Sequence, residues 1–199
     1  MGGTFEPLAG GGAAVALDEI EVSILRSLAV QLLELIGPGP QAEDADPLAA
    51  LFAEGPTEAP SDPALARLFP DAYGGPGAPT EGPRAAETKA HAAEFRRFTE
   101  NDLRTRKRED ALEVVRTLDA LTPGGDGGAV LELTGTQPLR WLGALNDLRL
   151  TIAARLEITE DDEAGVLFRL PDSDPRKPMV MAYLWLGGLQ ETLVETLTP

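Results

Sequence analysis

The stretch RAAETKAHAAEFRRFTENDLRTRKREDALEVVRTLDAL, residues 84–121, decides the fold class because it contains neither proline nor glycine. Those two residues interrupt helices most strongly, so the stretch predicts one long helix, straight or bent. At about 100° per residue, Phe95 and Phe98 lie on one side of this helix, and the later apolar residues lie roughly 150° round from them. We therefore expect one neighbour to cover Phe95 and Phe98, and another to cover Leu103, Val114, Leu118 and Leu121.

Three more long helices are expected on either side of this stretch. The first covers residues 18–36, where Asp18 and Glu21 have the spacing of a capping box. The others run from about Gln137 to Glu157 and from Met179 to Leu197, each with a recurring apolar stripe. Short apolar stretches in residues 4–17 and AVLEL at residues 129–133 predict small strands. The expected fold is mainly α: a compact helical bundle of about four long helices, with a small β element from the N-terminal segment and residues 129–133.

Two segments of the chain have related patterns. GGAAVALDEIEVSILRSLAVQLLELI and GGAVLELTGTQPLRWLGALNDLRLTI each contain glycines, a short strand and an apolar helix, and Leu17 aligns with Leu133. Two strand–helix units packed about a pseudo-twofold axis would give this pattern. The general grammar of strand–turn–helix units would give it equally well.

Residues 37–86 differ in composition from the rest, because they hold ten of the 17 prolines together with many glycine, alanine and acidic residues. This composition favours a partly mobile connection over a packed core. DPLAALF from Asp46 and DPALARLF from Asp62 predict two short helical turns, each with an aspartate cap and a proline at the first position. We expect residues 1–199 to form a single domain.

The composition disfavours several classes of function. The net charge of -16 repels nucleic acid, and the absence of cysteine removes disulfides and thiolate chemistry. No stretch of the sequence resembles a membrane span or a signal peptide, so we expect a cytoplasmic protein. His91 is the only histidine, and the acidic run Glu160–Glu163 lacks the ligand spacing of a calcium loop. The sequence thus predicts no catalytic residue, no cofactor and no metal site.

Basic residues concentrate in the segment 96–108, which holds Arg96, Arg97, Arg104, Arg106, Lys107 and Arg108. Such a cluster is typical of a site for nucleic acid, phosphate or an acidic partner. However, Glu100 lies four residues before Arg104, and Asp102 lies four residues before Arg106, which is the spacing of intrahelical ion pairs. A helix surface that partly neutralises itself is the favoured interpretation.

Asn-Asp-Leu-Arg occurs twice, at residues 101–104 and 146–149. Helical phase directs Asp102 and Arg149 inward and turns Asp147 outward. A partly buried arginine needs a carboxylate, so we expect Asp102 and Arg149 to form a structural pair across two packed helices. The alternative is a ligand site, for which the candidate residues are Asn101, Asp102, Arg104, Asn146 and Arg149.

Four motifs resemble an actinobacterial family known only as a domain of unknown function: AAEFRRFTENDLRTRK, WLGALNDLRLTIAARLEITEDD, WLGGLQETLV and DPALARLFPDAY. The genes of this family typically lie beside the gene of ClpS, the adaptor that delivers N-degron substrates to the Clp protease. The resemblance implies a mainly helical cytosolic protein with a link to regulated proteolysis. It brings no established activity or catalytic residue.

The function expected from these observations is that of a non-catalytic protein-interaction or regulatory protein connected with Clp-dependent proteolysis. Its protein partner is unidentified, and homo-oligomerisation is open. The first alternative is a nucleic-acid-binding transcriptional regulator that uses residues 96–108. The second is a small-anion-binding protein or enzyme at Arg104 and Arg149.

Overall fold

A computed structural model describes residues 3–38, 54–74, 81–122, 124, 128–158 and 169–198. The predicted turn after Asp46 and the acidic run Glu160–Glu163 lie outside these residues. The described elements are β1 (Glu6–Pro7), β2 (Ala13–Leu17), α1 (Glu19–Ile36), α3 (Pro63–Leu68), α4 (Pro83–Asp119), β3 (Ala129–Leu133), α5 (Gln137–Arg155) and α7 (Lys177–Leu197).

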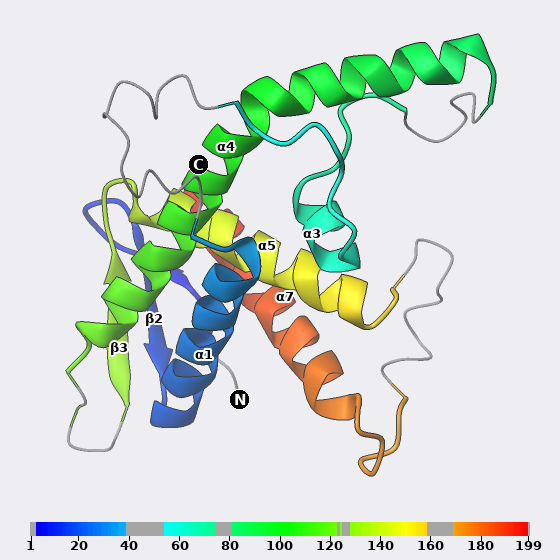
Figure 1. The fold of residues 1–199 in the computed structure, drawn as a ribbon. Coiled ribbons are helices and arrows are strands. Elements are labelled where there is room, and N and C mark those ends of the chain that lie inside the picture. The colour runs from blue at the N-terminus through cyan, green and yellow to red at the C-terminus, as the bar shows by residue number, and fades with distance from the viewer. Residues whose placement is uncertain are drawn as a thin grey trace.

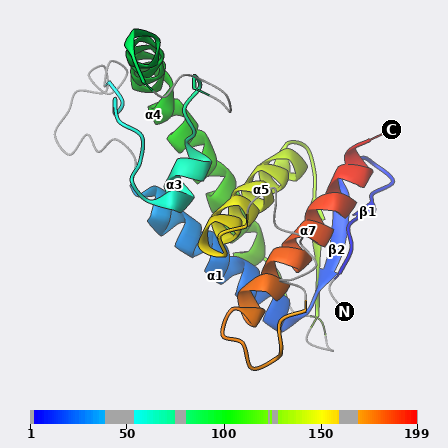
Figure 2. The ribbon, with the colours of Figure 1, turned by 90° about the vertical axis from the view of Figure 1, so that its right-hand side faces the viewer.

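The mainly α prediction is confirmed, because four long helices, α1, α4, α5 and α7, form most of the described structure (Figure 1). Helix α4 is one element of 37 residues, as the stretch without proline and glycine predicts. Its C-terminal part packs with α1 and α5, whereas its N-terminal part turns away and projects as an arm (Figures 1 and 2). No helix in the described part of the chain combines the length and the apolar character that crossing a membrane requires.

The predicted small β element is also present, as a three-stranded antiparallel sheet in the order β1-β2-β3. Strand β2 pairs with β3 so that Ala13 faces Leu133, Val15 faces Leu131 and Leu17 faces Ala129. Leu17 and Leu133 occupy equivalent positions in the aligned segments, so this register is symmetric about the pair Val15–Leu131. A pseudo-twofold axis between two strand–helix units requires this arrangement.

Equivalent caps strengthen the relation between the two units. The backbone N–H of Asp18 donates to Glu21 Oε2 at 3.0 Å, and that of Thr134 donates to Gln137 Oε1, also at 3.0 Å. The Asp18 carboxylate in turn accepts from the Glu21 N–H at 2.8 Å, which completes the predicted capping box of α1. Each strand therefore passes into its helix through a glutamate or glutamine that binds back to the chain.

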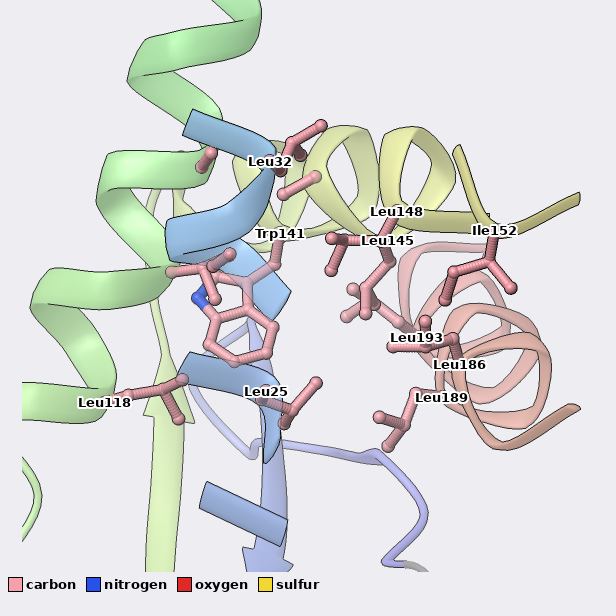
Figure 3. Packing of buried hydrophobic residues seen from close by; sticks show 14 of the residues in the cluster. Leu25, Leu32, Leu118, Trp141, Leu145, Leu148, Ile152, Leu186, Leu189 and Leu193 are labelled. Atoms are coloured by element: carbon pink, nitrogen blue, oxygen red, sulfur yellow. The ribbon is translucent and has the colours of Figure 1, made fainter. Parts of the chain in front are cut away.

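Trp141 of α5 lies at the centre of the core (Figure 3). Its ring is fully buried, meets Phe5 edge-on at 6.2 Å between centroids, and donates its indole N–H to Thr117 Oγ1 of α4 at 3.0 Å. Apolar side chains from all four long helices and from the sheet surround it, among them Leu25, Leu118, Leu145 and Leu186. A hydrogen bond links α7 to the N-terminal segment, because the Phe5 N–H donates to Thr192 Oγ1 at 3.1 Å.

Helix α3 is the short turn expected after Asp62. The Asp62 carboxylate accepts from the N–H groups of Ala64 and Leu65, and its second oxygen binds Arg155 of α5 at 2.8 Å. Phe69, just after α3, is 2% exposed and belongs to the core. The connection is thus anchored at this point, and the chain leaves it toward the α4 arm.

We predict that Thr117→Val destabilises the protein by about 1–3 kcal/mol, because it leaves the buried indole N–H of Trp141 without an acceptor. Urea unfolding followed by tryptophan fluorescence measures this change. The matched control is Thr105→Val on the same helix, where the exposed hydroxyl donates only to the Asn101 carbonyl at 3.0 Å. That control is expected to stay within about 0.5 kcal/mol of the wild type; equal effects of the two substitutions would contradict the role assigned to Thr117.

Candidate functional site

The basic segment of α4 begins with an arginine that is almost completely buried. Arg96 is 5% exposed, forms an ion pair with Glu100, and donates to Asp71 Oδ1 and to the Phe69 carbonyl, each at 2.9 Å. Burial alone would lower the pKa of Arg96, but the hydrogen bonds that Arg96 donates to Asp71 and Glu100, together with their negative charge, outweigh it and the pKa is raised. This guanidinium is therefore a fixed structural cation that joins α4 to the chain after α3.

Glu100 extends the same network along α4. Its carboxylate is 3% exposed and also accepts from Arg104, with the closest contact at 2.8 Å, so the ion pair predicted between these two residues is confirmed. Arg104 donates further to the Ile36 carbonyl at 2.9 Å and stacks over the Phe69 ring at 4.3 Å. One buried carboxylate thus orients two arginines.

The next cations along α4 donate hydrogen bonds to carbonyls at the C-terminus of α1. Arg108 donates to the Gly37 carbonyl and, at 3.4 Å, to the Leu33 carbonyl. Helix α1 has no basic residue in its own last turn. Arg104 and Arg108 consequently bind the Ile36 and Gly37 carbonyls at the end of the helix and place positive charge at the negative end of the helix dipole.

Lys107 and Asp147 form the charged pair between α4 and α5. Lys107 Nζ lies 2.6 Å from Asp147 Oδ1, and Asp147 is 2% exposed. The prediction that Asp147 points outward is wrong, because α4 packs against α5 and its Lys107 lies over this position. Burial raises the pKa of the Asp147 carboxyl, although the bond from Lys107 acts in the opposite direction.

The predicted pair between Asp102 and Arg149 does not form. Asp102 is exposed on α4, whereas Arg149 faces α7, donates to Gln190 Oε1 at 2.5 Å and stacks over the Tyr183 ring at 5.1 Å. The helical phase of Arg149 is right, but its neighbour is α7 rather than α4. The guanidinium of Arg149 lies against Gly187, where a Cβ would be in ordinary van der Waals contact with Arg149 Nε at 3.6 Å.

The remaining candidates do not form a common ligand site. Arg104 and Arg149 contact different elements, α1 and α7 respectively, so they do not build the predicted anion site together. Asn146 hydrogen-bonds the buried Asp147, and Asn101 lies beside Gly55 on the outer side of α4. The two Asn-Asp-Leu-Arg copies therefore perform different structural tasks.

The basic segment leaves little free positive charge for an external ligand. Besides the four cations described above, Arg97 pairs with Glu54 at 3.0 Å, and only Arg106 remains fully exposed, near Asp110. The i,i+4 spacing correctly predicted the pair of Glu100 with Arg104, whereas no ion pair joins Asp102 to Arg106 in the described structure, and Asp71 and Asp147 were not predicted as partners. Asp71 and Asp147 lie far along the chain from their partners Arg96 and Lys107, so helical periodicity cannot reveal these pairs.

The aromatic side chains of the arm point into solvent, contrary to the prediction that a neighbour covers Phe95 and Phe98. Phe95 is 46% exposed and Phe98 is 61% exposed, because Ala92, Arg96 and Glu100 form the buried face instead. Tyr73, 48% exposed, packs its ring against His91 at 6.0 Å and Phe95 at 6.1 Å between centroids. We call these five side chains, Tyr73, His91, Glu94, Phe95 and Phe98, the aromatic face; they line a shallow pocket of about 370 Å³.

A larger hollow of about 880 Å³ lies between α1, α5 and α7. Its lining is mostly aliphatic and includes Leu28, Leu35, Ile152 and Met179. Two charged side chains line it: Arg155, which is already bound to Asp62, and Glu34 of α1. The described lining thus offers no pair of groups arranged for acid–base or nucleophilic chemistry.

We predict that Lys107→Met costs about 3–5 kcal/mol at pH 7, because it leaves the buried Asp147 carboxylate without its cation. The pKa of Asp147, already raised above its ordinary value, would rise further. As the pH falls toward about 4, the folded protein then takes up a proton before the unfolded chain does, so the deficit relative to the wild type shrinks. Urea unfolding between pH 7 and 4 measures it.

Two variants control this experiment. Arg106→Met, one residue earlier and exposed, should change stability little at any pH. Lys107→Met combined with Asp147→Leu should cost less than Lys107→Met alone, since no charge is then left buried. A deficit that is independent of pH would show that lost packing of the lysine stem, and not the carboxylate, causes the effect.

Comparison with known proteins gives the chain its family. The family model described as a domain of unknown function, DUF2017, matches residues 2–197. Proteins of Mycobacterium tuberculosis and Mycobacterium bovis, each named oxidative stress regulator AosR, are 31% identical to it over 177 residues, 87% of this chain and 77% of theirs. No solved structure matches the chain significantly. The resemblance to an actinobacterial domain of unknown function is thereby confirmed, and the chain belongs to the DUF2017 family.

Proposed function

We propose that this protein is a non-catalytic regulator that acts by contacting another protein through the aromatic face of the α4 arm. The observation that carries the proposal is the exposure of Phe95 and Phe98 beside Tyr73 on an element that projects from the bundle (Figure 1). Contiguous exposed apolar side chains are a cost in water unless they serve an interface. Aromatic residues are also those most enriched where binding energy concentrates.

The arm is held firmly enough to present this face. The ion pairs of Arg96 with Glu100 and Asp71 fix the base of the arm. Arg96 also donates to the carbonyl of Phe69, the residue that follows the short helix α3. The aromatic side chains therefore start from a defined arrangement, which reduces the ordering cost of association.

The names of the mycobacterial relatives support a regulatory role, and we place it in the response to oxidative stress. The sequence contains no cysteine, so the contribution of this chain to such a response does not use one of its own thiols. Clp-dependent proteolysis, which the family resemblance implies, is one process in which such a protein contact would act.

A transcriptional regulator that binds nucleic acid through residues 96–108 is less well supported. The cations of this segment bind Glu54, Asp71, Glu100, Asp147 and the carbonyls of α1, so few of them could replace counterions on a phosphate backbone. Regulation of transcription through contact with another protein remains within the proposal.

We predict that Phe95→Ser combined with Phe98→Ser abolishes the regulatory function without unfolding the protein, because both side chains are about half exposed or more. The variant is expressed in a strain that lacks the gene, and survival in peroxide and the transcript profile are compared with those of the wild type. Both readouts should fall to the level of the empty vector.

The control is Leu139→Ser on α5, which removes a side chain that is 63% exposed but lies away from the arm. It should complement as the wild type does, and circular dichroism should show native helix content in both variants. Full complementation by the double serine variant would refute the proposed surface. Sequence-selective binding of duplex DNA by the purified protein in a mobility-shift assay would favour the nucleic-acid alternative.

A further inference from the structure

We propose that the pocket of the aromatic face binds an arginine side chain of the partner protein, whose guanidinium stacks on Tyr73 and Phe95 and pairs with Glu94. This inference rests on the proposed function and specifies the chemistry of the partner. The pocket combines two features that favour a planar cation: exposed π faces and a carboxylate.

Geometry places these features together. His91, Glu94, Phe95 and Phe98 occupy successive turns on one side of α4, at spacings of three and four residues. Tyr73 reaches this side from the segment after α3 and meets Phe95 almost perpendicularly, at an interplanar angle of 84°. The resulting hollow of about 370 Å³ is shallow, so it suits the end of one side chain better than an enclosed metabolite.

The chain itself shows how its aromatic rings are used. Three rings already carry a guanidinium: Phe69 with Arg104 at 4.3 Å, Phe98 with Arg97 at 4.9 Å, and Tyr183 with Arg149 at 5.1 Å. Tyr73 and Phe95 have no such cation among the described residues. They form the exposed aromatic pair whose π faces are available to an external guanidinium.

The charge in the pocket also favours a cationic ligand. Glu94 is exposed, and no ion pair joins it to a described residue, whereas the neighbouring Arg96 and Arg97 are neutralised by Asp71, Glu100 and Glu54. The exposed charges that flank the pocket along α4 are of both signs, with Arg84 and Lys89 as well as Glu87 and Asp102, but the carboxylate in the lining itself is that of Glu94. The pocket therefore presents negative charge to a partner.

The test uses His91, the only histidine, whose imidazole protons give a one-residue NMR signal within the pocket. The full-length protein is titrated at constant pH with N-acetyl-arginine methylamide, and separately with the citrulline and leucine analogues. Citrulline has the shape of arginine without its charge. The arginine compound should shift the His91 signal saturably, and the two neutral compounds should shift it much less.

Two variants separate the contributions of charge and ring. Glu94→Gln should weaken the binding of the arginine compound about two- to fivefold, the range expected for loss of an exposed ion pair. Phe95→Leu keeps the apolar bulk but removes the π face, and it should also weaken the binding of the arginine compound about two- to fivefold. Glu191→Gln, an exposed carboxylate on α7, is the matched control and should leave the titration unchanged.

Equal shifts with arginine and citrulline, or no saturable shift with arginine, would overturn the arginine site. Such a result combined with loss of regulation in the double serine variant would mean that the aromatic face is used for a partner of other chemistry. If the arginine compound binds but the double serine variant still regulates, the proposed function fails instead.

Discussion

The network around the buried carboxylate of Glu100 is the interaction on which the rest of this structure depends. Glu100 binds Arg96 and Arg104 at once, and these arginines bind the chain after α3 and the last carbonyls of α1. An isolated buried carboxylate would be strongly destabilising, and here it is stabilised only because both cations are fixed by further acceptors. Glu100 thereby links α4 to the end of α1 and to the chain after α3, alongside the apolar packing of Val114 and Leu118.

The same network explains why the N-terminal part of α4 leaves the bundle with aromatic side chains on its surface. The buried side of α4 is taken by Ala92, Arg96 and Glu100, so Phe95 and Phe98 must turn to the opposite side. Pairing of Arg96 and Glu100, together with burial of the small Ala92, thus accompanies this orientation of the arm, and burial of the two phenylalanines does not. Large apolar side chains are ordinarily buried, so we expect a surface that keeps them exposed to have been selected for binding.

Much of the fold follows from the sequence, because it depends on local and periodic signals. The long helix without proline and glycine, the capping box at Asp18 and the strand at residues 129–133 are all predictable. The candidate site was harder to predict. Helical phase places Arg149 inward correctly but cannot say that Gln190 and Tyr183 of α7 receive it. Asp147 lies opposite the apolar stripe of its own helix, and only the path of α4 across α5 reveals why it is buried.

The internal use of the basic residues also changes how the net charge should be interpreted. Nine of the 17 lysines and arginines lie in residues 84–118, and the structure turns several of them toward carboxylates and carbonyls of the bundle. Carboxylates such as those of Glu87, Glu94 and Asp102 lie exposed at the surface of the arm. The exposed charges of the arm are therefore of both signs, with Arg84 and Lys89 beside Glu87 and Glu94. In the contact that we propose, the carboxylate of Glu94 would attract a cation, and the rings of Tyr73 and Phe95 would favour the planar cation of arginine over the compact ammonium of lysine.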